Sequence, residues 1–189
     1  SIGELKSILP IIDFYLKKSP NYNFLITTVT LSSFYEFEKK YNTNKRVFHQ
    51  FMPYDLKFLI NNFLKKWSPD VATFVDSEIW PNFILKLKDE KVPLILLNAR
   101  ISKKSFLRWK AFQNSTKKIF NSFSLCISSN KDTSDYLKIL GAQNVKFFGN
   151  IKFCSSIENE ISGIDQFNQV TNRRIWCALS THKNEEDLF

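Results

Sequence analysis

The sequence predicts an α/β fold built on a mainly parallel sheet covered by helices on both faces. Short apolar runs typical of strands alternate with longer stretches in which apolar residues recur three and four positions apart, as on one face of a helix. Strands and helices that alternate at this pitch form βαβ units, whose strands are parallel. No glycine-rich phosphate cradle follows any strand, which disfavours a classical dinucleotide-binding or P-loop enzyme.

The predicted elements follow one another in a regular order. The chain opens directly on a helical stretch, Leu5–Lys18, so the strand that would feed this helix is expected to be missing. Strand-like runs then begin near Asn23, Lys45, Val71, Leu94, Leu125 and Val145. Helical periodicity fills the intervals over Leu31–Tyr41, Asp55–Trp67, Phe83–Glu90, Phe106–Phe120 and Lys131–Leu140. Gly141 follows the last helix at the usual position of a C-terminal stop.

This order of elements divides the chain into three parts. Residues 1–153 read as one α/β domain without its first strand. Residues 154–172 have weak patterning and many polar side chains, as in a connecting segment. Residues 173–189 read as a strand and the turn into a helix, which would begin a second α/β domain. We therefore expect a window from a longer protein of two domains.

Composition and charge narrow the functional classes. Hydrophobic residues at 43% and aromatic residues at 15% are too many for a disordered tail, and no apolar run reaches the roughly 18–20 residues of a spanning helix. The formal charge of +9 leaves a nucleic-acid-binding module open, although the abundance of Lys, Asn, Ile and Phe also fits an AT-rich coding sequence. The three scattered cysteines and two histidines have no metal-ligand spacing, so no metal site is expected.

Polar side chains gather in the loops that follow the predicted strands. Three such loops are Asp76–Asn82, Asn98–Ser102 and Gly149–Phe153, and the segments Gly3-Glu4 and Ser180-Thr181-His182 extend the set. The carboxyl ends of parallel strands meet at one rim of a sheet, where ligands bind. Carboxylates, amides and cations at this rim outline a sugar or anion site.

A series of short motifs runs in one order from the first residue to near the last. They are Ser1-Ile2-Gly3-Glu4, Thr27-Thr28-Val29-Thr30, Pro53-Tyr54-Asp55, Glu78-Ile79-Trp80-Pro81-Asn82, Asn98-Ala99-Arg100-Ile101-Ser102, Leu140-Gly141-Ala142, Gly149-Asn150-Ile151-Lys152-Phe153 and Ser180-Thr181-His182. In these motifs and their order the chain resembles the 3-deoxy-D-manno-octulosonic acid (Kdo) transferases of lipopolysaccharide assembly. The resemblance implies a GT-B glycosyltransferase, in which two Rossmann-like doubly wound domains face each other across a cleft.

The resemblance also implies an activity and its partners. The whole protein would move Kdo from CMP-Kdo to a lipid A precursor, with inversion and without a cofactor or metal. It would work at the cytoplasmic face of the bacterial inner membrane, bound peripherally or through a missing N-terminal anchor, and would not bind nucleic acid. The present chain would hold the acceptor domain and little of the CMP pocket, and would be inactive alone. The alternatives are another GT-B glycosyltransferase or a catalytically silent relative that binds glycolipid.

Three residues are assigned to catalysis on this resemblance. Glu4, with Ser1 and Gly3 in its motif, would be the base that takes the proton from the acceptor hydroxyl; its structural alternative is a first-turn carboxylate that complements the helix dipole. Asp76 stands where the family more often has Glu, a residue credited with supporting the transition state. Lys152 matches a cation that would offset the charge developing on departing CMP.

The remaining candidates would line the substrate site. They are Ser1, Gly3, Glu78, Trp80, Asn82, Asn98, Arg100, Ser102, Asn150, Ser180, Thr181 and His182. Structural roles stand beside these assignments: Asp76 and Glu78 would cap the helix that starts near Pro81, and Asn98 would hold its own loop together.

A basic run interleaved with apolar residues gives a candidate membrane surface. Its members are Lys103, Lys104, Phe106, Leu107, Arg108, Trp109, Lys110, Phe112, Lys117 and Lys118. Cations beside aromatic side chains suit an anionic bilayer, and an ordinary solvated helix face is the alternative.

Overall fold

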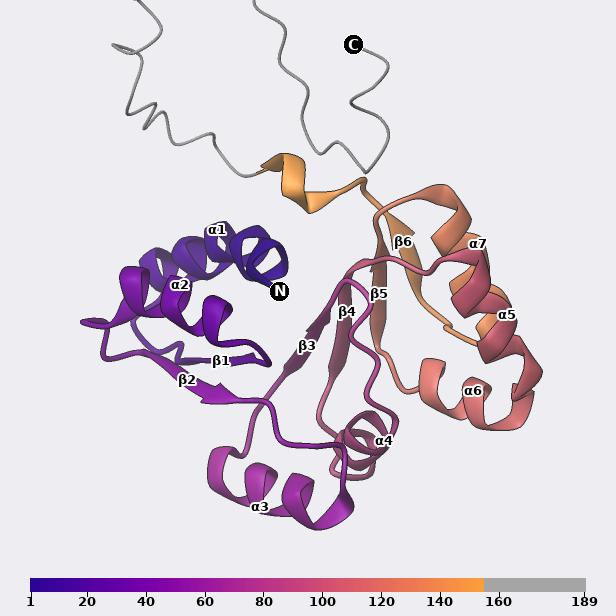
Figure 1. The fold of residues 1–189 in the computed structure, drawn as a ribbon, viewed down its shortest axis with the longest axis horizontal. Helices are drawn as coiled ribbons and strands as arrows, with labels where there is room; N and C mark the ends of the chain where they lie inside the picture. Colours follow the sequence, from indigo (N-terminus) through magenta and orange to yellow (C-terminus); the bar gives the residue numbers. More distant parts are fainter. Residues whose placement is uncertain (155–189) are drawn as a thin grey trace, which may run out of the picture. The chain divides into compact units, whose positions relative to one another are not determined.

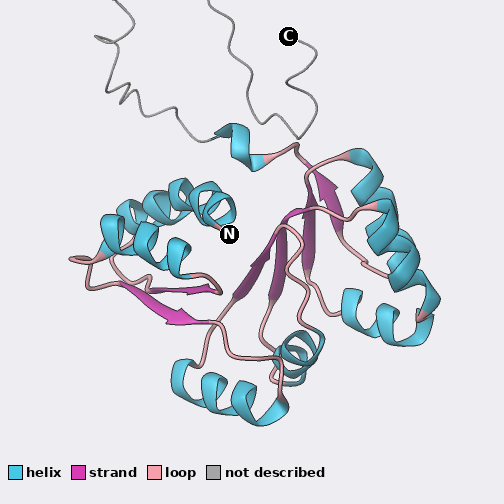
Figure 2. Ribbon diagram, viewed as in Figure 1, coloured by secondary structure: helices cyan, strands magenta, loops and turns pink. Residues whose placement is uncertain are grey.

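Helices and strands alternate through residues 1–154, the part of the chain that the computed structural model describes, except at the consecutive helices α5 and α6 (Figures 1 and 2). The elements are α1 (Ile2–Lys18), β1 (Phe24–Thr28), α2 (Leu31–Tyr41), β2 (Val47–Phe51), α3 (Lys57–Trp67), β3 (Ala72–Val75), α4 (Pro81–Asp89), β4 (Leu94–Ala99), α5 (Lys103–Ala111), α6 (Gln113–Phe120), β5 (Leu125–Ser128), α7 (Lys131–Leu140), β6 (Val145–Phe147) and the 3-10 turn η1 (Ile151–Cys154). The predicted α/β class is confirmed. The strand and turn predicted over 173–189 lie outside the described residues.

All described strands pair in parallel, in two sheets. One sheet has the order β1-β2 and the other the order β3-β4-β5-β6. The predicted parallel sheet is thus present, but it is divided. Within residues 1–154, β1 pairs only with β2, and β3 pairs only with β4. Because the strands are parallel, the loops after β3, β4, β5 and β6 leave their sheet at one edge.

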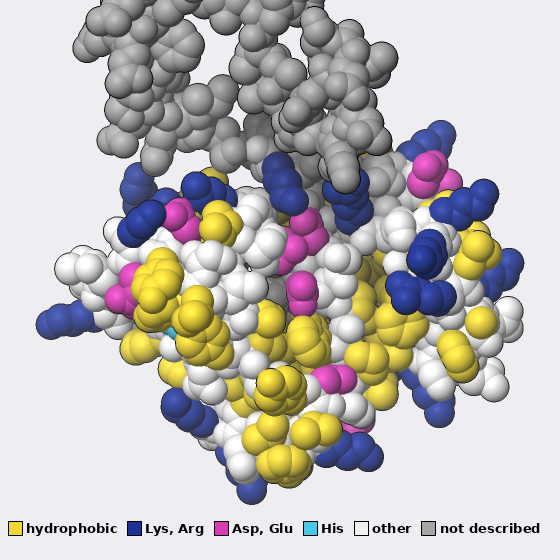
Figure 3. All heavy atoms as spheres, in the orientation of Figure 1, with side chains coloured by type: hydrophobic (Ala, Val, Ile, Leu, Met, Phe, Trp, Pro, Cys, Tyr) yellow, Lys and Arg dark blue, Asp and Glu magenta, His cyan; other side chains and the backbone are white. Residues whose placement is uncertain are grey.

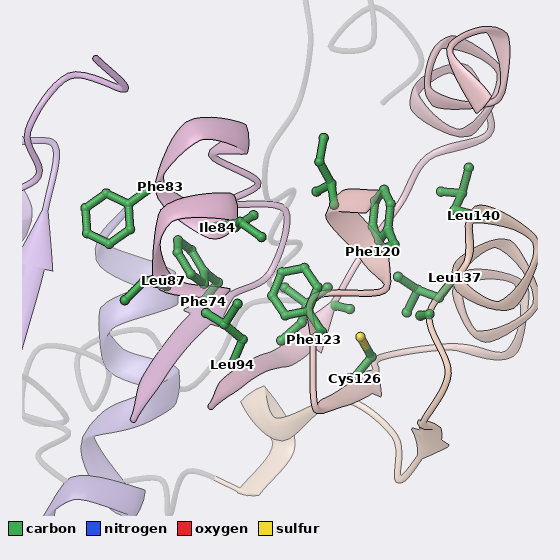
Figure 4. Packing of buried hydrophobic residues seen from close by; sticks show 14 of the residues in the cluster. Phe74, Phe83, Ile84, Leu87, Leu94, Phe120, Phe123, Cys126, Leu137 and Leu140 are labelled. Atoms are coloured by element: carbon green, nitrogen blue, oxygen red, sulfur yellow. The ribbon is translucent and has the colours of Figure 1, made fainter. Parts of the chain in front are cut away.

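Each sheet has its own hydrophobic core. The larger core contains the fully buried side chains of Ile60, Ile84, Leu94 and Phe120, contributed by α3, α4, β4 and α6. Figure 4 shows side chains of α4, α6 and α7, among them Ile84, Phe120 and Leu137, converging with strand side chains such as Leu94 on this core. The smaller core joins α1, α2, β1 and β2 through Leu5, Ile12, Ile26, Phe37, Tyr41 and Val47.

Cys126 is a fully buried thiol within the larger core. It lies on β5, fully buried, and burial raises the pKa of its thiol to about 12. Such a thiol is inert. Cys126 therefore packs as a small apolar residue within a buried strand.

The predicted helix over Phe106–Phe120 is wrong in one respect. The structure has two helices, α5 and α6, which meet at Phe112 with φ −113° and ψ 51°. The Trp109 carbonyl stabilises the break, because it accepts hydrogen bonds from the Phe112 amide at 3.1 Å and from the Thr116 hydroxyl at 2.7 Å.

Of the described helices, none is long and apolar enough to cross a membrane.

Candidate active site

Two neighbouring strands turn through the same unusual backbone conformation at the carboxyl edge of the four-stranded sheet. Asp76, directly after β3, has φ 56°, and Asn98, near the end of β4, has φ 54°. Asp and Asn enter this left-handed region more readily than other residues that carry a side chain. Backbone hydrogen bonds link the two corners: the Asp76 amide donates to the Leu97 carbonyl at 3.0 Å, and the Arg100 amide donates to the Asp76 carbonyl at 3.2 Å.

The side chains at these two corners bond to each other and to the turn after β6. The Asn98 Nδ2 group donates to Asp76 Oδ1, and Asn98 Oδ1 accepts from the Ile151 amide at 3.2 Å. Lys152 Nζ lies 2.8 Å from Asp76 Oδ2. We call Asp76, Asn98, Ile151 and Lys152 the rim cluster. Sequence analysis placed Asp76, Asn98 and Lys152 on separate loops of one rim, and the structure brings them into direct contact.

The electrostatics of the rim cluster are set by one buried carboxylate. Only 7% of Asp76 is exposed, and each of its oxygens has a donor: an amide on Oδ1 and an ammonium on Oδ2. A carboxylate held in this way is an acceptor and an anchor rather than a free base. Lys152 is exposed at the surface of the cluster, where a cation can meet an anionic ligand.

Glu4 lies in the first turn of α1, in a capping box. The Glu4 amide donates to Ser1 Oγ at 3.4 Å, and Glu4 Oε2 accepts from the Ser1 amino group at 2.8 Å. The structural alternative foreseen for Glu4 is therefore present, and it leaves the carboxylate partly exposed. Gly3 faces open space. Because α1 packs against η1, the helix that carries Glu4 is in contact with the turn that carries Lys152.

Neither Asp76 nor Glu78 caps α4, contrary to the structural alternative considered for them. Glu78 Oε2 accepts a 2.7 Å hydrogen bond from Trp80 Nε1, and Trp80 packs against the larger core. The cap comes from Asp55, whose carboxylate accepts from the Asn82 amide at 3.0 Å and from the Phe83 amide at 2.8 Å.

Asp55 was missed as a functional position by sequence reasoning. Its signal was present, since Asp55 closes the Pro53-Tyr54-Asp55 motif. The side chain of Asn82 is also engaged here, because its Nδ2 donates to the Asp55 carbonyl at 2.8 Å. Asp55 therefore fixes the loop after β2 to the start of α4.

The other predicted site residues occupy different settings. Ser102 caps α5 by accepting from the Ser105 amide at 3.2 Å. Arg100 is exposed, and no described residue hydrogen-bonds its guanidinium, which leaves its planar fork open to an anion. Asn150 Oδ1 accepts from the Lys152 amide at 3.0 Å. Ser180, Thr181 and His182 lie outside the described residues.

His49 does not belong to this site. Its Nε2 lies 2.8 Å from the Thr28 hydroxyl, and burial lowers the pKa of the imidazole below its ordinary value. Within residues 1–154 no group of three His, Cys, Asp or Glu side chains has an arrangement that could hold a metal ion.

Comparison with known proteins identifies relatives over the whole chain. The model of the family described as 3-deoxy-D-manno-octulosonic-acid transferase (kdotransferase) matches residues 1–155. The 3-deoxy-D-manno-octulosonic acid transferase of Rickettsia prowazekii (strain Madrid E) is 33% identical over 191 residues, which cover 100% of this chain and 41% of the relative. The enzyme of the same name from Haemophilus influenzae is 26% identical, with 100% and 45% covered.

The chain also matches a relative whose name gives two activities. The bifunctional glycosyltransferase/methyltransferase of Fusobacterium nucleatum is 27% identical over 173 residues, which cover 88% of this chain and 27% of the relative. The chain thus spans less than half the length of these relatives. The rim cluster and Glu4 both fall within the 155 residues that the family model matches. On this match, the chain belongs to the 3-deoxy-D-manno-octulosonic acid (Kdo) transferase family.

Proposed function

We propose that the protein containing this chain is an inverting glycosyltransferase that moves Kdo from CMP-Kdo to a lipid A precursor in lipopolysaccharide synthesis. The observation that carries the proposal is the rim cluster, in which the buried carboxylate of Asp76 and the amide of Asn98 join two matched motifs, Asn98–Ser102 and Gly149–Phe153. This chain contributes the acceptor side of the site. It is expected to be inactive alone, and transfer by the purified 189-residue chain would contradict that expectation.

The proposed reaction exchanges one bond for another at the anomeric carbon of Kdo. A hydroxyl oxygen of the acceptor forms the new bond to this carbon while the bond to the CMP phosphate oxygen breaks. Glu4 accepts the hydroxyl proton as the general base. Lys152 offsets the negative charge that develops on the departing CMP. Asp76 holds the Lys152 ammonium at 2.8 Å and so fixes where that positive charge lies.

Substitution of Glu4 tests the proposal. Glu4→Gln keeps the capping box, because glutamine serves at this helix position as glutamate does, but it removes the base. In the complete protein we expect kcat for transfer from CMP-Kdo to fall by about 10²–10⁴-fold, with little change in the thermal midpoint.

Glu36→Gln provides the matched control for this experiment. Glu36 lies on α2 and pairs at the surface with Lys39 and Lys6, so the same chemical change there should leave transfer intact. Near-normal turnover by Glu4→Gln would remove Glu4 from the role of base. Efficient transfer from a nucleotide diphosphate sugar instead of CMP-Kdo would favour another glycosyltransferase activity.

We further propose that the protein binds peripherally to an anionic membrane, at the cytoplasmic face of the bacterial inner membrane, through the loops after β1 and β2. Large exposed apolar side chains lie in these loops and on the adjoining elements α2, β2 and α3, and Figure 3 shows hydrophobic atoms spread over α2 and α3. We call this set the apolar loop surface: Val29, Leu31, Tyr35, Phe51, Tyr54, Leu56 and Phe58. Phe34 links part of it, with its ring centroid 5.7 Å from those of Tyr35 and Phe51.

The setting of Tyr54 supports this choice of surface. Tyr54 is 79% exposed, yet the next residue, Asp55, fixes its loop to α4 through three hydrogen bonds. An aromatic side chain presented on an anchored loop is suited to insert among lipid headgroups. The formal charge of +9 favours an anionic bilayer as the partner, and a lipid acceptor would be supplied from that bilayer.

A further inference from the structure

We infer that Asn98 is a positioning residue for transfer: its amide holds the Asp76 carboxylate and the η1 turn in the arrangement that directs Lys152 toward the substrate. The inference rests on the roles proposed above for Asp76 and Lys152. The side chain of Asn98 is not free to bind substrate, because it is 2% exposed and both ends of its amide are engaged within the protein.

The backbone at Asn98 adopts a left-handed conformation that is uncommon for a residue with a side chain. Asp76 and Asn98 both have positive φ values, on adjacent strands and at adjacent corners. The β4–β5 pairing also shifts register between Leu96 and Ala99. Non-glycine residues in this conformation are uncommon, and they concentrate where a site requires a particular geometry.

The side chain of Asn98 meets a requirement that few residues satisfy. It donates through Nδ2 to Asp76 Oδ1 and accepts through Oδ1 from the Ile151 amide at 3.2 Å. Aspartate would tolerate the backbone but would supply no N–H donor and would place a second negative charge against Asp76. Glycine would tolerate the backbone better still, but it would supply neither hydrogen bond.

Asn98 thereby connects parts of the chain that are far apart in sequence. Ile151 is 53 positions from Asn98, and Lys152 is 76 positions from Asp76. Asn98 fixes one oxygen of Asp76, which leaves Oδ2 directed at the Lys152 ammonium. It also fixes the first amide of η1, the turn against which α1 packs. Losing the Asn98 amide should therefore misplace Lys152 and loosen the support of the helix that carries Glu4.

The experiment compares the same substitution at two asparagines, one near the end of β4 and one after the neighbouring strand β5. Asn98→Asp removes the donor to Asp76. Asn130→Asp is the matched control, because Asn130 Oδ1 caps α7 by accepting from the Thr133 amide at 2.8 Å, and aspartate caps a helix equally well. Asn98→Gly separates the amide from the backbone, since glycine keeps the left-handed conformation.

Two measurements are made on each variant. Hydrogen exchange of the Ile151 amide in the 189-residue chain reports the contact itself, without any need for transfer. We expect Asn98→Gly to reduce its protection by about tenfold, the effect of one lost hydrogen bond, with protection of β4 and β5 unchanged. In the complete protein we expect kcat to fall by about 100-fold for Asn98→Asp and Asn98→Gly, with KM nearly unchanged, while Asn130→Asp behaves as the parent.

The possible outcomes separate this inference from the proposed function. If Ile151 keeps its protection in Asn98→Gly, or if both Asn98 variants turn over normally, Asn98 does not position the cluster. Loss of protection spread evenly over β4, β5 and α5 would assign Asn98 to the fold instead, and would also overturn the inference. If the complete protein shows no transfer from CMP-Kdo but Ile151 loses its protection selectively, the proposed function fails while the contact argued for Asn98 stands.

Discussion

At the scale of single residues, Asp55 shows how one carboxylate can secure two parts of the site. The N-cap residue of α4, Trp80, makes no side-chain cap, and the two amides at the start of the helix are satisfied by Asp55 instead. From the sequence, Asp76 and Glu78 in the adjacent loop were the expected capping residues of α4. Sequence reasoning could not find a cap 27 positions away, because such a contact depends on how the strands pack.

Replacement of Asp55 by alanine tests this cap. It should lower the free energy of unfolding by about 1–2 kcal/mol, since the amides of Asn82 and Phe83 lose their acceptor. Urea denaturation of the 189-residue chain measures the change, with Asp55→Asn retaining most of the stability. Asp70→Ala, at an exposed aspartate, is the control for loss of a carboxylate alone. Equal stability of the Asp55 and Asp70 variants would show that the capping contacts contribute little.

The rim cluster shows what residue-level prediction can reach. The left-handed corners at Asp76 and Asn98 follow from their positions directly after predicted strands, where Asp and Asn are favoured. The predicted placement of Asp76, Asn98 and Lys152 at one edge of the sheet agrees with the contacts among them. The pairing within the cluster could not be read from the sequence, because it depends on η1 folding back over residues that precede it by 53 and 76 positions.

At the scale of elements, the positions of loops and helix faces distinguish the two candidate membrane surfaces. The basic run predicted as that surface lies on α5 and α6, which the structure separates at Phe112. Much of its apolar content faces inward: Phe106 is buried and stacks on Tyr136 with centroids 4.2 Å apart, and Trp109 packs edge to face on Phe120. Helical periodicity could not separate these core aromatics from surface ones, because apolar and basic residues interleave.

Phe112 and Tyr54 allow the two candidate membrane surfaces to be compared directly. Their exposed fractions are similar, 72% and 79%, and one belongs to the basic run while the other belongs to the apolar loop surface. We expect Tyr54→Ser combined with Phe58→Ser to reduce flotation of the chain with vesicles of phosphatidylglycerol and phosphatidylethanolamine by about tenfold or more.

The control for the vesicle experiment is Phe112→Ser combined with Leu107→Ser, which removes two exposed apolar side chains from the basic run. These substitutions should change flotation little. If they abolish flotation and the Tyr54 and Phe58 substitutions do not, α5 and α6 form the membrane surface. Weak flotation of the parent chain, insensitive to every substitution, would argue against a membrane surface in either place.

At the scale of the whole molecule, β1 and β3 are edge strands of two different sheets among residues 1–154. β1 pairs only with β2 and β3 only with β4, and all strands run in parallel. Alternating elements predicted the parallel pairing, because βαβ connections require it. The prediction that a strand precedes Ser1 remains a prediction, and the topology offers it a place between β1 and β3, where it would join the sheets into one doubly wound sheet.

Amide exchange at the two open edges tests that placement. In a parallel strand, alternate amides face opposite neighbours. The amides of Ala72 and Asp76 donate to carbonyls of the β4 side, so the amide of Thr73 faces the open edge of β3. By the same alternation, the Leu25 amide faces the open edge of β1, since the Phe24 amide donates to the Arg46 carbonyl on the β2 side.

We expect the Thr73 and Leu25 amides to exchange rapidly in the 189-residue chain and to be protected in the complete protein, because an inserted strand would bond to both. The Ile95 and Leu96 amides, on a strand paired on both sides in this chain, should be protected in each case. Rapid exchange of Thr73 and Leu25 in the complete protein would place the preceding strand elsewhere and leave the two sheets separate.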